Sequence, residues 1–152
     1  MRQKQRLIVS RVRKWFKMYY DHLDLIGQYQ YADGEGTVHR VKLHYSDVIL
    51  FERIRSLELD GKRFYMTNES ISEQLKMSES TVKECIRRLS AIGLVRTFYE
   101  RPYNGRVTGI RYLYTQTARL NQLMRIKELQ RQGGISEGMV DLIFLEDQGL
   151  LS

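Results

Sequence analysis

The chain has 152 residues, of which 42% are hydrophobic, and it carries a formal net charge of +7. This length suits one domain with appendages, and the apolar content is enough to build a core. A basic balance favours a polyanionic partner, and no apolar run approaches the roughly 18 residues that predict a membrane span. With Cys85 as its one cysteine, the chain can form neither an intrachain disulfide nor a cysteine metal cluster, and we expect a cytoplasmic protein.

The first 20 residues contain seven basic side chains and no acidic one, which is the whole charge excess of the chain. Over residues 4–26, hydrophobic residues recur every three or four positions, as on one face of an amphipathic helix. We predict a helix there. Its apolar stripe can pack in the core or in a dimer seam, its basic side can contact phosphates, and a basic amphipathic helix with a tryptophan can also lie on a membrane surface.

A β-hairpin is predicted next. Residues 28–32 and 37–43 are rich in β-forming side chains, and the sequence Asp-Gly-Glu-Gly at positions 33–36 supplies a turn between them. His39 and His44 lie on or beside the second strand, where a surface or half-buried role is the ordinary expectation.

Four elements follow in close succession. Ser46 is predicted to cap a helix over 47–57, and residues 64–66 are predicted to form a short strand. Thr67 is predicted to cap a helix over 68–76, with Ile71 and Leu75 facing inward. Ser78 is predicted to cap a second helix over 79–92. The inward stripe of that helix consists of Val82, Cys85, Ile86, Leu89 and Ile92.

The rest of the chain predicts a second hairpin and two helices. Strands over 94–99 and 110–114 flank a long loop that contains Pro102 and Gly105. Thr115 or Thr117 is expected to cap a helix that runs to about residue 132, and the glycines at 133 and 134 stop it. A final acidic helix is predicted over 136–147.

Two short helices joined by a tight turn and followed by a hairpin are the order of a winged helix-turn-helix. A helix fits the major groove of DNA, where each base pair presents a distinct pattern of donors and acceptors. The preceding helix buttresses it, and the hairpin, or wing, reaches the backbone or an adjacent groove.

The stretch 64–95 reads FYMTNESISEQLKMSESTVKECIRRLSAIGLV. It resembles the winged helix-turn-helix of plasmid and phage replication proteins from Gram-positive bacteria, and it is similar to the DNA-binding domains of GntR-like and MarR-like regulators. The shared pattern is T-N-E-x-I at 67–71, S-x-S-T-V at 78–82 and G-L-V at 93–95. Lys76 departs from it, because many such turns have glycine there. The chain is also shorter than the long replication initiators.

We therefore expect an α+β fold: a winged helix-turn-helix over 45–115, an N-terminal unit of helix and hairpin over 1–44, and C-terminal helices over 116–152 that could mediate dimerisation. The resemblance implies that the second helix faces the groove, and we expect Arg101 and Arg106 of the wing to hold the flanking backbone or minor groove. The predicted DNA-binding residues are Ser78, Ser80, Thr81, Lys83, Glu84, Arg87, Arg88, Arg101 and Arg106. A plainer alternative for Arg87 and Arg88 is a solvated pairing with Glu84 at helical spacing.

The predicted function is sequence-specific binding of double-stranded DNA, in a replication or transfer accessory protein of a plasmid, phage or conjugative element. Its predicted partners are duplex DNA, a second copy of the chain, and replication or transfer proteins, with no membrane. A transcriptional repressor and a winged-helix module that binds proteins are the alternatives. No catalytic motif, metal site or cofactor is predicted: tyrosine nucleases need a His-hydrophobe-His motif, and His22, His39 and His44 are not so spaced.

Overall fold

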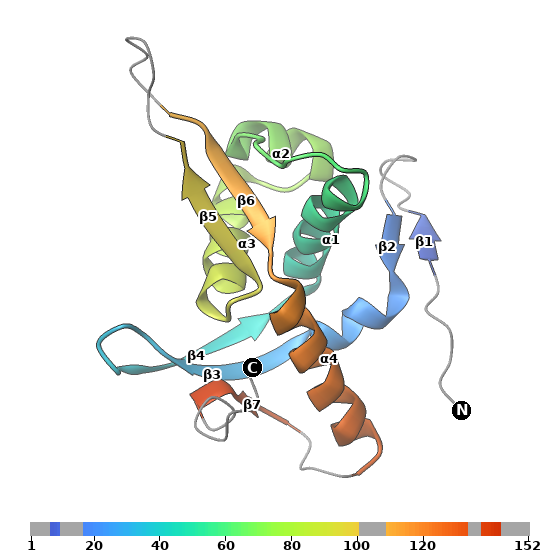
Figure 1. Ribbon diagram of the computed structural model, residues 1–152, viewed down its shortest axis with the longest axis vertical. Helices are drawn as coiled ribbons and strands as arrows, with labels where there is room; N and C mark the ends of the chain where they lie inside the picture. Colours follow the sequence, from blue (N-terminus) through green and yellow to red (C-terminus); the bar gives the residue numbers. More distant parts are fainter. Residues whose placement is uncertain (1–6, 10–16, 101–108, 134–137, 144–152) are drawn as a thin grey trace.

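The computed structural model describes residues 7–9, 17–100, 109–133 and 138–143 (Figure 1). In chain order the elements are β1 (Leu7–Val9), β2 (Lys17–Tyr19), the 3-10 helix η1 (Tyr20–Leu25), β3 (Gly27–Ala32), β4 (Val38–Leu43), α1 (Tyr45–Leu59), α2 (Asn68–Leu75), α3 (Glu79–Ala91), β5 (Val95–Tyr99), β6 (Arg111–Thr115), α4 (Thr117–Arg131) and β7 (Val140–Asp141). This mixture of helices and strands confirms the α+β class.

Helices α1, α2 and α3 form one body, and the β5–β6 hairpin packs beside them (Figure 1). The two wing strands are antiparallel, with Val95 opposite Thr115 and Tyr99 opposite Arg111. Phe64 adds an isolated antiparallel bridge to Leu113. The short strand predicted at 64–66 is thus reduced to one bridge, which closes the wing against the loop before α2. This is the arrangement of a winged helix.

A second sheet lies beneath this body, in the order β4-β3-β7 (Figure 1). Strands β3 and β4 form the predicted hairpin, and their pairing runs from Gly27 opposite Leu43 to Ala32 opposite Val38. The turn between them needs a left-handed residue, which Gly36 supplies at φ +83°. Strand β7 pairs in parallel with β3 on its other side.

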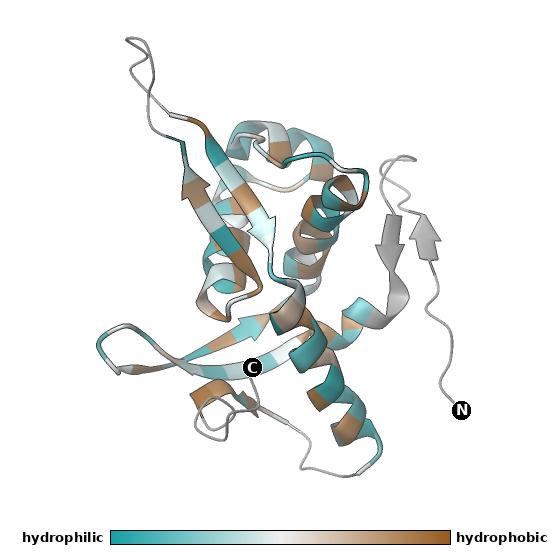
Figure 2. Cartoon of the chain, in the orientation of Figure 1, coloured by the Kyte–Doolittle hydropathy of each residue, from teal (hydrophilic) through white to brown (hydrophobic). Residues whose placement is uncertain are grey.

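The hydrophobic core runs through both layers without a break. Its largest fully buried side chains come from η1, from the β3–β4 hairpin, from helices α1, α2 and α3, and from the segments beside α2 and the wing strands: Leu25, Tyr29, Leu43, Leu50, Phe51, Ile54, Phe64, Ile71, Leu89, Ile92 and Leu94. Figure 2 shows hydrophobic and hydrophilic residues interspersed along the helices α1–α4 and along the strands of the two hairpins, as expected where one side of an element packs inward.

The helix predicted over 4–26 is wrong at residues 7–9 and 17–19, which form strands. Residues 7–9 and 17–19 form an antiparallel pair of strands, with Leu7 opposite Tyr19, and a 3-10 helix follows. Short apolar runs fit a strand as well as a helix, and pairing between residues about ten positions apart decided the outcome. Residues 10–16, which include much of the expected stripe, lie outside the described residues.

Two predicted caps are also wrong. His44, not Ser46, is the N-cap of α1, because the Asp47 carboxylate at the third helical position accepts the His44 amide at 2.7 Å. Helix α4 starts after Gln116, whose side chain makes no capping bond. The Thr115 hydroxyl and amide are bonded to Glu58 of α1, and the Thr117 hydroxyl accepts from Arg55. Both threonine hydroxyls are therefore engaged by side chains of α1 and do not cap α4.

The acidic helix predicted over 136–147 is wrong at residues 140 and 141, which form β7. Here Val140 pairs with Tyr29, and the Asp141 carboxylate accepts from the Gln30 side chain at 3.4 Å. The open side of β3 offers unpaired backbone groups, and a nearby extended segment can satisfy them. Residues 144–147 lie outside the described residues.

Helix α4 ends near the predicted stop, where Gly133 has φ +75°. It folds back on its own chain: Leu120, Leu123 and Ile126 are buried, and the helix packs against η1. The predicted unit boundaries fall close to the ends of β4 and β6, but the continuous core does not separate the units. That division, and dimerisation through α4, stay predictions.

Candidate nucleic-acid interface

The turn between α2 and α3 is built from two caps and one left-handed residue. The Thr67 hydroxyl accepts the Ser70 amide, and the Ser78 hydroxyl accepts the Thr81 amide, each at 3.1 Å. Between the helices Lys76 adopts φ 57° and ψ 44°. A side chain is strained in this conformation, which is why glycine is common there. Both predicted caps are confirmed, and the turn closes without the glycine.

Helix α3 presents opposite faces to the core and to solvent. Val82, Cys85 and Leu89 are at most 1% exposed, and Ile92, just past the helix end, is fully buried. Ile86, the fifth residue of the predicted stripe, is half-buried against the core. The outward positions include Ser80, Lys83, Glu84 and Arg87, all exposed. The inward stripe is confirmed, and the hydrophilic side is open to a partner.

Three hydroxyl groups gather at the first turn of α3. The Ser78 hydroxyl lies 2.8 Å from the Thr81 hydroxyl and 3.1 Å from that of Ser80. Ser78 and Ser80 are exposed, while Thr81 is half-buried. A helix N-terminus carries a partial positive charge, so hydroxyls that can donate there favour an anion such as a phosphate.

Arg87 and Glu84 form an exposed ion pair on the outward face of α3. Two nitrogens of the Arg87 guanidinium lie 2.9 and 3.1 Å from one Glu84 oxygen. The hydrogen bond raises the pKa of Arg87 and lowers the pKa of Glu84. This is the solvated pairing that the sequence offered as the plainer alternative. Because each side chain is more than half exposed, the pair is weak and Arg87 can exchange it for another anion.

Arg88 does not lie on this outward face. Its Nε donates to both carboxylate oxygens of Asp47 at 2.9 and 3.1 Å, and the Asp47 side chain is fully buried. Burial lowers the pKa of Arg88, but the hydrogen bond and charge of Asp47 outweigh it and the net shift is upward. Helical spacing could not reveal this bond, because Asp47 is 41 residues away and belongs to α1. The geometry assigns Arg88 to holding α3 on α1.

The wing supplies one free cation within its described strands. Arg96 on β5 is exposed. Arg111 on β6 instead donates to the Asn68 side chain at 2.7 Å and to the Met66 carbonyl at 2.8 Å, which fixes the start of α2. Arg101 and Arg106, the predicted wing-tip contacts, lie outside the described residues.

An aromatic cluster covers part of the wing. Tyr112 stacks on Tyr114 and meets Tyr65 edge-on, and Arg63 lies over its ring. Phe98, opposite Tyr112 in the strand register, is 57% exposed. These contacts join strand β6 of the wing to the segment before α2.

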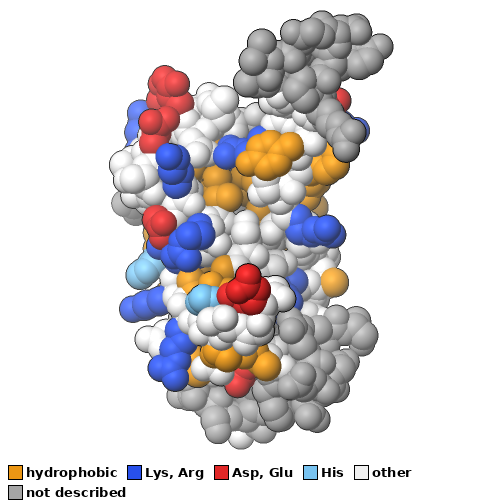
Figure 3. Space-filling model, turned by 90° about the vertical axis from the view of Figure 1, so that its left-hand side faces the viewer, with side chains coloured by type: hydrophobic (Ala, Val, Ile, Leu, Met, Phe, Trp, Pro, Cys, Tyr) orange, Lys and Arg blue, Asp and Glu red, His pale blue; other side chains and the backbone are white. Residues whose placement is uncertain are grey.

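Sequence reasoning missed the β3–β4 hairpin as a neighbour of α3. Strand β4 packs beside α3, and its Arg40 and Lys42 are exposed. Figure 3 shows Lys and Arg side chains on one face of the molecule, from the helix-turn-helix level down to this hairpin, interspersed with acidic ones. The alternation of β4 could have marked both as surface residues, but no local pattern indicates which helix lies next to them.

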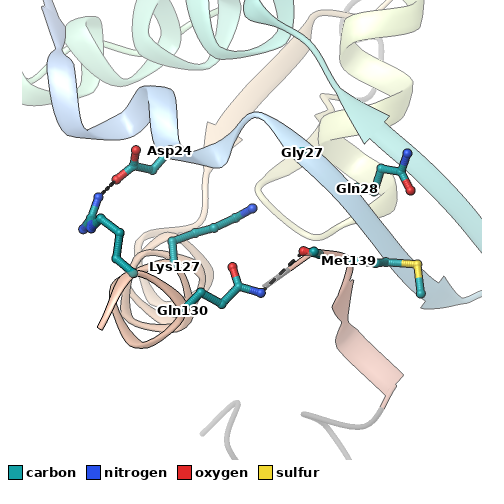
Figure 4. A pocket seen from close by; sticks show the side chains of 8 residues that line it. Asp24, Gly27, Gln28, Lys127, Gln130 and Met139 are labelled. Atoms are coloured by element: carbon teal, nitrogen blue, oxygen red, sulfur yellow. Dashed lines mark hydrogen bonds and ion pairs between the residues drawn. The ribbon is translucent and has the colours of Figure 1, made fainter. Parts of the chain in front are cut away.

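A pocket of about 410 Å³ lies away from this face, between α4 and the start of β3 (Figure 4). Lys127 points across it toward Gly27, and its amino group lies over the Tyr29 ring. Burial lowers the pKa of Lys127. Arg131, on the rim, pairs with Asp24. The pocket belongs to the junction that seats α4 on the lower sheet.

In the described part of the chain, no group of three His, Cys, Asp or Glu side chains is placed to hold a metal ion. Over the same residues, no helix is both long and apolar enough to cross a bilayer.

Comparison with known proteins agrees with the geometry. Residues 65–96 match the family model described as winged helix-turn-helix DNA-binding, a span that includes α2, the turn, α3 and the start of β5. No curated protein matches the chain, and neither does any solved structure. The chain therefore contains a winged helix-turn-helix domain of the DNA-binding kind.

Proposed function

We propose that the protein binds a specific site in double-stranded DNA by placing the outward face of α3 in the major groove. The observation that carries this proposal is the exposed polar side of α3, set between a capped N-terminus and the wing. Lys83 and Arg87 can contact bases or phosphates, and the hydroxyls of Ser80 and Thr81 can do the same from the first turn.

The exposed pair of Arg87 and Glu84 on α3 suits an arginine that exchanges its carboxylate partner for DNA on binding. Guanidinium groups bind guanine edges and phosphates in a bidentate manner. Arg87 is paired with Glu84 while its own side chain remains 56% exposed. Glu84 can accept from a cytosine amino group once Arg87 moves to the DNA. The proposed contact set is therefore Ser78, Ser80, Thr81, Lys83, Glu84 and Arg87, with Arg101 and Arg106 retained as predicted wing contacts.

The experiment is a binding-site selection from random duplexes, followed by mobility-shift titration of the enriched duplex at several salt concentrations. The unaltered protein is expected to enrich one motif. Arg87→Ala should cost about 1–3 kcal/mol on that motif if Arg87 reads a base, and Lys83→Ala should weaken all duplexes alike if Lys83 contacts phosphate. Arg125→Ala, an exposed arginine on α4, is the matched control. Failure of the unaltered protein to bind any duplex at low salt refutes the proposal.

For the biological role we propose a replication or transfer accessory protein of a plasmid, phage or conjugative element. The resemblance of residues 64–95 to replication proteins supports it. A repressor would occupy a site that overlaps a promoter, whereas an accessory protein would occupy an origin. Genome-wide mapping of bound sites separates the two. Light scattering with and without the selected duplex tests the predicted homodimer.

A further inference from the structure

Helix α3 is bonded to the first turn of α1, which directly follows the β3–β4 hairpin, and β4 packs beside α3. The Cys85 thiol donates to the Ser46 hydroxyl at 3.5 Å, and Arg88 pairs with Asp47. Both partners lie in the first turn of α1, which follows β4 directly. Farther out, the pKa of Arg87 is raised mainly by its hydrogen bond to Glu84 and also by the charge interaction with Tyr31 of β3. Helix α3 therefore packs beside one strand from each of two hairpins: β4 of the β3–β4 hairpin and β5 of the wing.

Strand β4 separates apolar and basic side chains onto its two faces. Val41 and Leu43 are 7% and 0% exposed, and they belong to the core. Arg40 and Lys42 point to the other face and are exposed. Among the described residues, no carboxylate forms an ion pair with either of them. Among the described strands, β4 is also the edge of its sheet, so one side of its backbone has no neighbouring strand.

One acidic side chain of this hairpin, Asp33, is already used by the turn. The Asp33 carboxylate accepts the amides of Glu35 and Thr37 at 2.9 and 3.0 Å, and the His39 ring at 2.7 Å. It is therefore committed to closing the hairpin. The tip carries negative charge, and the positive charge lies along β4, between the tip and α3.

Arg40 and Lys42 are two residues apart on β4, so their Cα atoms are separated by about 7 Å. Two long cationic side chains at this spacing can reach neighbouring phosphates of one DNA strand. On the proposed function, α3 lies in a major groove with a phosphate backbone along each of its edges. The wing is proposed to contact the backbone along one of those edges. For the other edge, the remaining basic element that packs against α3 is β4.

We propose that β4 is a second backbone-binding element, in which Arg40 and Lys42 bind phosphates of the duplex that α3 reads. This inference rests on the proposed function. The competing explanation is that the two charges only keep an exposed edge strand from pairing with other chains, and the experiment separates the two.

The variant is Arg40→Ala/Lys42→Ala, and the control is Lys62→Ala/Arg125→Ala, which removes the same charge from the loop after α1 and from α4, where both residues are also exposed. Each phosphate contact contributes about 0.9 to the slope of log affinity against log salt. Two lost contacts should lower that slope by about 1.8, so the advantage of the unaltered protein over the variant should shrink about tenfold between 50 and 200 mM salt. The control should keep the original slope.

Hydroxyl-radical footprinting on the selected duplex gives a second readout. The variant should lose protection over two or three sugar positions beside the α3 site and keep the same base preference. An unchanged slope and footprint, with binding still sensitive to Arg87→Ala, would overturn this inference and leave the proposed function standing. If the unaltered protein binds no duplex, both fail. Matching circular dichroism and melting curves confirm that the variant is folded.

Discussion

Arg88 offers the sharpest test of how the interface is held, because its neighbour Arg87 provides a matched comparison one position away. Arg87 forms an exposed pair with Glu84, and Arg88 forms a pair with Asp47, a residue whose side chain has no exposure to solvent. We consider replacement of each arginine by methionine, which keeps the length of the aliphatic stem and removes the charge.

Removal of Arg88 leaves the Asp47 carboxylate buried without its cationic partner, although the His44 amide still donates to it at 2.7 Å. Breaking a buried pair by deleting one partner costs about 3–5 kcal/mol. Because Asp47 keeps that bond and the Arg88 side chain is 15% exposed, we expect a value near the lower limit, about 3 kcal/mol. Arg87→Met should cost under about 1 kcal/mol, as for other exposed pairs.

The reverse change is expected to be milder. Asp47→Asn keeps an oxygen that accepts the His44 amide. The freed Arg88 guanidinium can turn toward Glu84, whose Oε2 lies 3.6 Å from the Nη1 of Arg88. We expect about 1 kcal/mol for this change, close to the loss of one ordinary hydrogen bond. The asymmetry between the two partners follows from their burial.

Urea unfolding followed by circular dichroism measures all three variants, and the double variant Arg88→Met/Asp47→Asn completes a cycle that gives the coupling between the partners. DNA binding by the folded variants gives the complementary readout: Arg87→Met should weaken binding, and Arg88→Met should not. Equal stability losses for Arg87→Met and Arg88→Met would refute the assignment, and so would a loss of base preference on Arg88→Met.

Three further outcomes are expected. Lys76→Gly should raise the free energy of unfolding by about 0.5–1 kcal/mol in a urea titration, since Lys76 is exposed and glycine adopts its left-handed conformation without strain; a loss of stability would contradict that account of the turn. Burial raises the pKa of Cys85 to about 11, so the folded protein at pH 8 should react with a thiol reagent far more slowly than the urea-unfolded chain, and equal rates would show that the residue is accessible. The hydrogen bond from His39, with those from the Thr37 and Glu35 amides, lowers the pKa of Asp33. The contribution of the ionised Asp33 carboxylate to stability is therefore present above the pKa that Asp33 has in the unfolded chain, and it is lost as pH falls through the lower pKa of the folded protein. Carboxyl carbon NMR should show that Asp33 titrates below an ordinary aspartate.

The sequence alone determined those parts of the protein whose cause is local. Thr67 and Ser78 cap α2 and α3 because their hydroxyls meet amides three residues ahead. The stripe from Val82 to Leu89 faces inward because of the helical repeat. The β3–β4 hairpin forms around a turn that contains its own glycines and aspartate, so its position could also be predicted.

Only the tertiary structure decided the features that depend on distant partners. Residues 7–9 and 17–19 became strands by pairing with each other, and Val140 became a strand because β3 had an open side. Arg88 and Arg111 carry the same charge as Lys83 and Arg96, but partners 41 and more residues away bind them. Periodicity reports which way a side chain points from its own helix or strand. It cannot report which element lies there, because that depends on how separate parts of the chain share one core.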